Sequence, residues 1–185
     1  EEKQVSVDGQ THTLPSPYFV VATQNPSDQI GTFPLPESQL DRFLMRIELG
    51  YPNEENERAL LTGTDRRELL PTVEPVLNPE MLLALQTAAA NVHMTDPLVD
   101  YIQALVRFTR ESPDIETGLS PRGSLALVAS ARAHAYIESH SGVFPDDVQA
   151  VFASVAGHRL KPASNSAYRT PAELSRHVLD NVAIP

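Results

Sequence analysis

Prolines beside helix-capping residues divide the second half of the chain into segments. Each of these prolines opens a stretch in which apolar residues recur every three or four positions. The stretches begin at Asn78-Pro79, Asp96-Pro97, Ser120-Pro121, Pro145 and Pro171. Proline is favoured in the first helical turn, where its missing N–H would have no partner, and a preceding polar side chain can cap the free N–H groups. The pattern predicts an all-helical domain over residues 77–185.

The first part of the chain has the pattern of β-structure instead. Asp8-Gly9 supplies the positive φ angles of a tight turn between two short runs of β-forming residues, which predicts a hairpin over residues 4–14. Residues 18–23 and 43–49 are short runs that are apolar on both faces, as is typical of interior strands in a covered parallel sheet. We therefore expect an α/β domain over residues 1–70.

Composition excludes several classes of function. The formal net charge is −10, and no basic face is visible, so we expect no direct contact with nucleic acid. The chain has no cysteine, which excludes disulfides and thiolate metal sites and suits a reducing, cytoplasmic compartment. No apolar run approaches the roughly 20 residues of a membrane helix, and the six histidines have no metal-binding spacing. We expect no membrane span and no metal ligands.

Asn25 lies just past the end of the predicted strand 18–23. Ligands of open α/β sheets bind outside the carboxyl ends of the strands. An amide at that place could orient a water molecule or contact a phosphate oxygen. The alternative is a plain Asn-Pro turn, and the dipeptide alone leaves both interpretations open.

Arg42 lies among apolar residues, between Leu40 and Phe43, with Asp41 beside it. An arginine in such a place needs an ionic partner or a path to solvent. One interpretation is therefore a pair with Asp41 or Glu37, or a side chain that reaches into water. The other is a guanidinium held by a rigid strand and directed at a phosphate of a neighbouring molecule.

Arg122 is the second residue of the helix that begins at Ser120-Pro121. A cation at the positive end of a helix dipole is disfavoured by roughly 0.3–1 kcal/mol, so it needs an anion. Free N–H groups at a helix start bind phosphate, and together with Arg122 they form a candidate anion site. The alternative is a salt bridge to an acid close in the sequence: Glu111, Asp114 or Glu116.

Three stretches resemble, in order, parts of one protein family. The stretch FVVATQNPSDQIGTFPLPESQLDRFLMRIELGYP resembles the second half of the ATPase core of MoxR-type AAA+ proteins. The stretch LSPRGSLALVASARAHAYIESHSGVFPDDVQAVFASVAGHRL is similar to their helical lid, and the hairpin over residues 4–14 resembles the insert before their sensor strand. The resemblance implies a AAA+ P-loop core remnant, with a β-hairpin and parallel strands, followed by an all-α lid.

The resemblance also implies roles by position. Asn25 matches the sensor-1 asparagine, which orients the attacking water near the γ-phosphate. Arg42 matches the arginine finger, which reaches the nucleotide of the adjacent subunit, and Arg122 matches the sensor-2 arginine, which contacts phosphates from the lid. Glu37 and Asp41 would support the finger. Cations placed in advance stabilise the charge that develops on a transferred phosphoryl group.

One part of the family's nucleotide site is absent from the sequence. No Gly-x-x-x-x-Gly-Lys-Ser/Thr phosphate loop occurs in it, whereas family members carry that loop and an acidic Mg²⁺-binding strand end upstream. The resemblance thus implies the C-terminal portion of a longer ATPase that uses ATP and Mg²⁺. By itself this segment would need no cofactor and would not hydrolyse ATP. Its two strands would lack neighbours, so we expect self-association through them or poor order in the first 50 residues.

The implied function is that of a chaperone-like motor that couples ATP hydrolysis to the remodelling or assembly of client protein complexes. Its partners would be its own copies in a ring, expected to be a hexamer, together with a von Willebrand factor A-type protein and the client complex. The missing phosphate loop keeps an alternative open, which is a non-enzymatic helical protein-interaction module.

Overall fold

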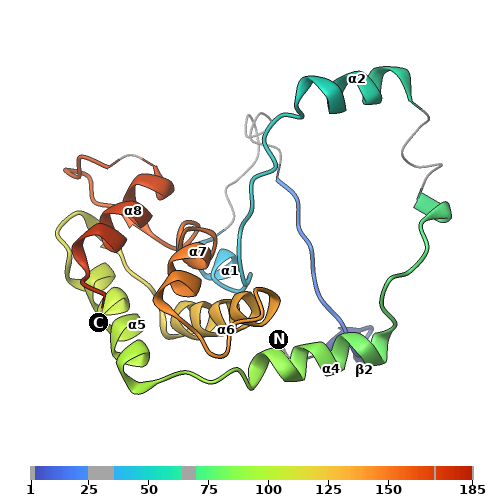
Figure 1. Ribbon diagram of the computed structural model, residues 1–185, viewed down its shortest axis with the longest axis horizontal. Helices are drawn as coiled ribbons and strands as arrows, with labels where there is room; N and C mark the ends of the chain where they lie inside the picture. The colour runs from blue at the N-terminus through green and yellow to red at the C-terminus, as the bar shows by residue number, and fades with distance from the viewer. Residues whose placement is uncertain (1–2, 25–35, 64–69, 169, 185) are drawn as a thin grey trace.

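The computed structural model describes residues 3–24, 36–63, 70–168 and 170–184. Figure 1 shows a helical body formed by the second half of the chain, and a long excursion that leaves this body and returns to it. The body consists of α4 (Pro79–Ala90), α5 (Asp96–Glu111), α6 (Pro121–Ile137), α7 (Pro145–Ala156) and α8 (Pro171–Asn181). The short helix α1 (Glu37–Leu40) lies against the body, whereas α2 (Glu54–Thr62) stands apart from it (Figure 1). A single 3-10 turn, η2 (Leu70–Thr72), lies on the way back to α4.

The helices of the body begin where the sequence predicts. Each of them carries a proline in its first turn. The side chains of Asn78, Ser120 and Thr170 accept hydrogen bonds from backbone N–H groups of the turns that follow. Such a cap contributes about 0.5–2 kcal/mol relative to alanine. The predicted helix starts are therefore confirmed.

One hydrophobic core joins α5, α6, α7 and α8, whereas α4 has no buried residue. α6 packs on α4 and α7, and α8 packs on α5 and α7. The largest side chains that are fully buried in the core are Leu105, Leu119, Leu127, Phe152 and Leu174. Each contributes about 1.5–3 kcal/mol through its removal from water. The core thereby holds the start of α6 and the end of α7, which carry the site described below, in a defined relation.

The predicted hairpin is confirmed. β1 (Gln4–Val7) pairs antiparallel with β2 (Gln10–Thr13). Between them, Asp8 and Gly9 have φ angles of 50° and 78°, the left-handed values that the tight turn of a two-residue hairpin requires. A second small sheet pairs β3 (Ile115–Thr117) with β4 (Lys161–Pro162). This sheet ties the chain after α5 to the chain after α7.

The two predicted parallel strands are not formed. Residues 18–23 and 43–49 carry no strand in the structure, and the sheets within the described ranges are the two small antiparallel pairs. The physical reason is the lack of a neighbour, because a strand is defined by hydrogen bonds to an adjacent strand. The prediction of two strands in a parallel sheet is therefore wrong for this structure, in which no strand among the described residues pairs with either run.

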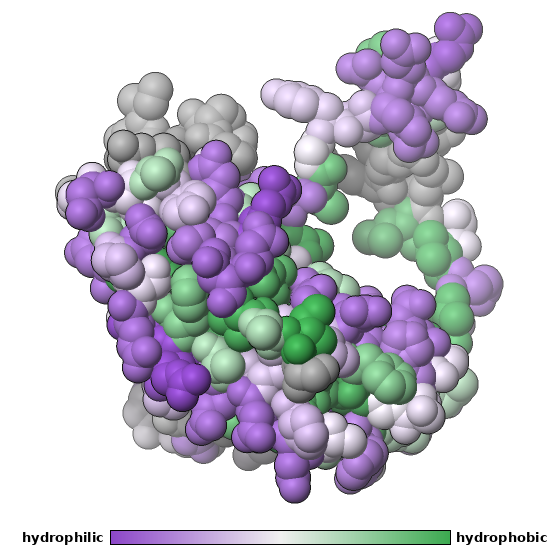
Figure 2. Space-filling model, turned by 60° about the vertical axis from the view of Figure 1, so that its left-hand side comes forward, coloured by the Kyte–Doolittle hydropathy of each residue, from purple (hydrophilic) through white to green (hydrophobic). Residues whose placement is uncertain are grey.

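Hydrophobic side chains consequently lie on the surface of the excursion. Phe19 is 75% exposed, Leu49 91% and Val76 90%. Figure 2 shows hydrophobic side chains along the chain that leads away from the helical body toward α2, where hydrophilic side chains dominate. No helix in the described part of the chain is both long and apolar enough to cross a bilayer.

Asp147 is a fully buried carboxylate that fastens the end of α6 to the start of α7. It accepts hydrogen bonds from His134 Nδ1 (2.7 Å), His140 Nδ1 (3.0 Å) and the backbone N–H of Phe144 (2.8 Å). Burial alone would raise the pKa of Asp147, but the bonds donated by Phe144, His134 and His140 outweigh it and hold the pKa below the ordinary 3.8. A carboxyl with a depressed pKa stabilises the fold above its ordinary pKa, and this contribution is lost as the pH falls through the folded value.

We predict that Asp147→Asn lowers the free energy of unfolding at pH 7 by about 1–3 kcal/mol, because the donors around the carboxylate lose their charged acceptor. The difference from wild type should shrink as the pH falls below about 4, where the unfolded chain takes up a proton on Asp147 and the folded carboxylate follows only at lower pH. Denaturant unfolding across this pH range measures both effects. The matched control is Asp146→Asn at the exposed neighbour, and an equal effect of the two substitutions would contradict the prediction.

Candidate functional site

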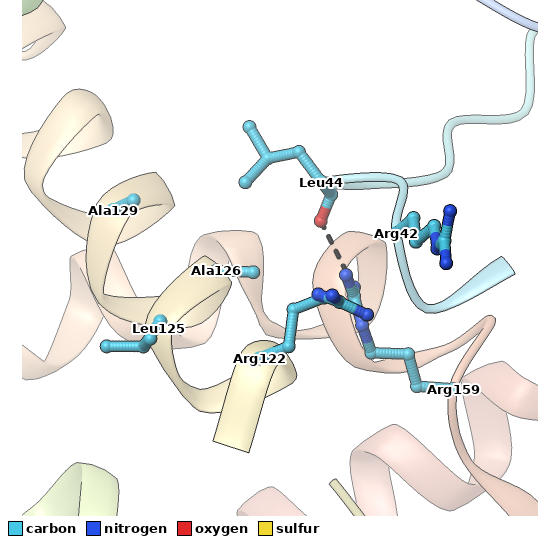
Figure 3. Close-up of a pocket in the computed structure, with 7 residues that line it drawn as sticks. All are labelled: Arg42, Leu44, Arg122, Leu125, Ala126, Ala129 and Arg159. Atoms are coloured by element: carbon cyan, nitrogen blue, oxygen red, sulfur yellow. Dashed lines mark hydrogen bonds between the residues drawn. The ribbon is translucent and has the colours of Figure 1, made fainter. Parts of the chain in front are cut away.

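The structure brings two of the three predicted site residues to one cavity. Arg42 and Arg122 both line a cavity of about 500 Å³ between the end of α1 and the first turns of α6. The third, Asn25, lies outside the described residues. The other residues that line the cavity are Leu44, Leu125, Ala126, Ala129 and Arg159. Figure 3 shows α6 on one side and the chain that carries Arg42 and Leu44 on the other.

Arg42 comes directly after α1 and its side chain is exposed. In Figure 3 it lies at the edge of the cavity, with its guanidinium pointing away from α6. Within the described ranges this guanidinium has no ion-pair partner. The sequence left a pair with Asp41 or Glu37 open, but Asp41 is held by other groups and Glu37 lies 3.8 Å from Lys161 Nζ. Arg42 is therefore available to an anion from outside the chain.

Arg122 stands in the first turn of α6, as predicted, and its anion is Asp41. The distance from Arg122 Nη1 to Asp41 Oδ2 is 3.7 Å. The hydroxyl of Ser120 connects the two elements, because it accepts from the Gly123 N–H (3.0 Å) as the helix cap and donates to Asp41 Oδ2 (2.9 Å). The carboxylate beside Arg122 thus comes from a distant part of the sequence and not from the nearby acids.

Arg159, after the end of α7, is the buried centre of this site, with only 3% of its side chain exposed. Nε donates to Asp41 Oδ1 (2.9 Å), and Nη2 donates to the backbone oxygens of Asp41 (3.0 Å) and Phe43. Nη1 donates to the backbone oxygens of Leu44 (3.1 Å) and Val155, and Figure 3 shows the bond to Leu44. A guanidinium has five N–H donors, and all of them are used here.

Residues at the end of α7 also hold the chain that follows Arg42. His158 Nε2 lies 3.2 Å from the backbone oxygen of Phe43, and the Arg46 N–H donates to the Ser154 oxygen at 2.8 Å. Burial lowers the pKa of His158, the charge of Arg159 lowers it further, and the bonds to the Phe43 and Ser154 carbonyls oppose them without prevailing. Residues 41–46, which we call the Arg42 segment, are thus docked on the helical body.

The cavity has the electrostatic character of an anion site. Three guanidinium groups line it, and the Asp41 carboxylate pairs with two of them, those of Arg122 and Arg159. All five N–H donors of Arg159 are used, whereas the side chains of Arg42 and Arg122 are exposed to solvent. Leu44, Leu125 and the two alanines form an apolar wall beside them. No group of metal-binding side chains is found among the described residues.

Sequence reasoning missed Arg159. Its signal was present, because an arginine next to Leu160 at the end of the apolar stripe of α7 cannot be buried without a partner. The partner could not be read locally, since Asp41 precedes it by 118 positions. Asp41 itself was expected only as a supporting residue, and it proves to be the carboxylate that joins the Arg42 segment to both α6 and α7.

Two family models match the stretches of chain that contribute the residues around the cavity. Residues 1–45 match the ATPase family associated with various cellular activities (AAA), and residues 107–178 match the AAA lid domain. The first match includes Arg42, and the second includes Arg122 and Arg159.

Individual proteins agree with this result. The chain is 38% identical to the uncharacterised protein YeaC of Bacillus subtilis, with 100% of this chain and 58% of that protein covered. It is 37% identical to the chaperone MoxR1 of Mycobacterium tuberculosis, with 100% and 52% covered. A solved structure from Cytophaga hutchinsonii, provisionally assigned as an ATPase, superposes with a TM-score of 0.87 at 29% identity and covers 100% of this chain and 59% of its own. The chain spans about half the length of the curated relatives that it matches.

We predict that the docked Arg42 segment stabilises the fold less at mildly acidic pH than at neutral pH. The pKa of His158 is lower in the folded chain than the ordinary 6.5, so the unfolded chain binds the proton first and stability falls as the pH drops below 6.5. His158→Gln keeps a donor for the Phe43 oxygen and should remove this part of the pH dependence. Unfolding measured between pH 7 and about pH 5 tests it. The exposed His93→Gln is the control, and an unchanged slope in His158→Gln would refute the assignment.

Proposed function

Because the chain belongs to the MoxR-type AAA+ ATPases, we propose that it supplies the arginine side of an ATP-hydrolysis site at the interface between two subunits of a ring. In this proposal Arg42 is the arginine finger and Arg122 is the sensor-2 arginine. The observation that supports it is that both side chains, which are distant in the sequence, line a single cavity. In this proposal the two side chains act on the phosphates of the same nucleotide, with Arg42 reaching it from the edge of the cavity (Figure 3).

The residues present fit the phosphate end of a nucleotide. Guanidinium groups bind phosphate oxygens through parallel N–H bonds, and Arg122 stands at the positive end of the α6 dipole, which also favours an anion. ATP would supply the phosphoryl group that is transferred to water. The task of Arg42 and Arg122 is to neutralise charge on the phosphate oxygens, from positions already set before the reaction. Mg²⁺ would be held elsewhere, since this sequence has no phosphate loop.

The role of Asn25 belongs to the same proposal. It follows residues 18–23 in the sequence, as the sensor-1 asparagine follows its strand, and it would orient the attacking water. The boundary between an α/β core part over residues 1–70 and a lid over residues 77–185 is likewise proposed. The AAA match over residues 1–45 and the AAA lid match over residues 107–178 support this division.

At the level of the whole protein we propose a cytoplasmic, chaperone-like motor that remodels or assembles client complexes. The relatives named MoxR and the relative named a chaperone support this. A hexameric ring of identical subunits and a von Willebrand factor A-type partner are part of the proposal. The absence of a phosphate loop from this sequence favours one competitor, a helical interaction module without ATPase activity, and turnover decides between the two.

We predict that, in the full-length protein, Arg42→Ala lowers kcat for ATP hydrolysis by about 10³-fold or more, as expected for an arginine finger. Nucleotide affinity should stay close to wild type, because the finger acts on the transition state. Arg122→Ala should lower both affinity and turnover, because Arg122 contacts the phosphates in the ground state as well. Steady-state ATPase assays and nucleotide titration give these values.

Arg107→Ala serves as the control, because Arg107 is exposed on α5 and does not line the cavity. Wild-type turnover in the Arg42 variant would exclude the finger role. A full-length protein that binds no nucleotide would support the interaction module instead.

A further inference from the structure

We infer that Arg159 is a positioning residue, which holds Arg42 and Arg122 in one fixed arrangement through the backbone and the carboxylate of Asp41. The inference rests on the proposed roles of Arg42 and Arg122. It assigns no contact with the nucleotide to Arg159, which is buried and has no free donor.

The first part of the argument is the backbone around Arg42. Arg159 donates to the carbonyl oxygen before Arg42, that of Asp41, and to the two after it, those of Phe43 and Leu44. An exposed arginine in a loop samples many directions, and ordering it at the moment of reaction has an entropic cost. Three fixed carbonyls leave the side-chain torsions of Arg42 as its main freedom.

The second part is the link to Arg122. Arg159 Nε holds Asp41 Oδ1 at 2.9 Å, and the Ser120 hydroxyl holds Asp41 Oδ2 at 2.9 Å. Ser120 is the N-cap of the helix whose first turn carries Arg122. The same carboxylate therefore sets the Arg42 segment against the start of α6, and Arg122 lies 3.7 Å from it.

The third part is why this position requires arginine. Its five donors reach four backbone oxygens and one carboxylate oxygen in different directions. Lysine has three donors on a single atom and cannot replace the planar fork. The surrounding packing is shaped for it, since a Cβ on Gly123 would lie 3.1 Å from Arg159 Cδ.

A consequence for motion follows from these contacts. The Arg42 segment is bonded to residues at the end of α7 and the start of α6, which share the core of the helical body. The finger therefore moves with the lid as one unit, and any lid rotation carries Arg42 and Arg122 together.

The test is a double-mutant cycle in the full-length ATPase, with wild type, Arg42→Ala, Arg159→Lys and the double variant. Arg159→Lys should lower kcat by about 100-fold, the effect of misplacing a catalytic group by about 1 Å, with KM for ATP within about twofold of wild type. In the Arg159→Lys background, Arg42→Ala should have little further effect, because Arg42 is already misplaced. Arg132→Lys, which alters another arginine that holds a backbone oxygen (that of Ala90), should leave kcat unchanged.

The outcomes separate the two proposals. If Arg42→Ala has no effect in the wild-type background, the proposed finger role fails first. If Arg42→Ala impairs turnover equally in both backgrounds, or if Arg159→Lys raises KM and spares kcat, the positioning role is overturned alone. Should Arg159→Lys fail to fold by circular dichroism, Ser120→Ala decides: it cuts the link from Asp41 to α6 and should lower kcat, and wild-type kcat in a folded Ser120→Ala protein overturns the inference.

Discussion

A guanidinium that is withdrawn from water needs a partner for every N–H and an anion for its charge, and these needs determine how the Arg42 segment lies. Arg159 finds its anion in Asp41 and its acceptors in the backbone on both sides of Arg42. Removal of the Asp41 charge would leave the Arg159 guanidinium buried without an anion, which is among the larger penalties in proteins. The contact between Arg159 and Asp41 also places the exposed Arg42 near Arg122 on α6.

The helical body makes this contact possible. The core around Leu127 and Phe152 sets the distance between α6 and α7, and the buried Asp147 fastens the end of one to the start of the other. The site uses the opposite ends, the start of α6 and the end of α7. Packing inside the helical body therefore sets the positions of Arg122 and Arg159 at the cavity, although Leu127 and Phe152 themselves do not line it.

Sequence reasoning succeeded where the determinants are local and failed where they are distant. Proline and capping side chains act within one turn, so Asn78 and Ser120 marked their helices correctly. Strands depend on partners elsewhere, and residues 18–23 have none among the described residues. For the site, the roles proposed for Arg42 and Arg122 came from family resemblance. The bond between Arg159 and Asp41, which links the two, could not be predicted, because these residues are brought together only by the fold.

The central claim is that Arg42 and Arg122 face the phosphates of one nucleotide while Arg159 keeps its hold on Asp41. A structure of the assembled full-length protein with a non-hydrolysable ATP analogue tests this most directly. The account predicts both guanidinium groups within about 3 Å of phosphate oxygens of the same nucleotide, with the bond from Arg159 to Asp41 intact. A nucleotide contacted by only one of the two arginines, with the other directed to a different site, would contradict it.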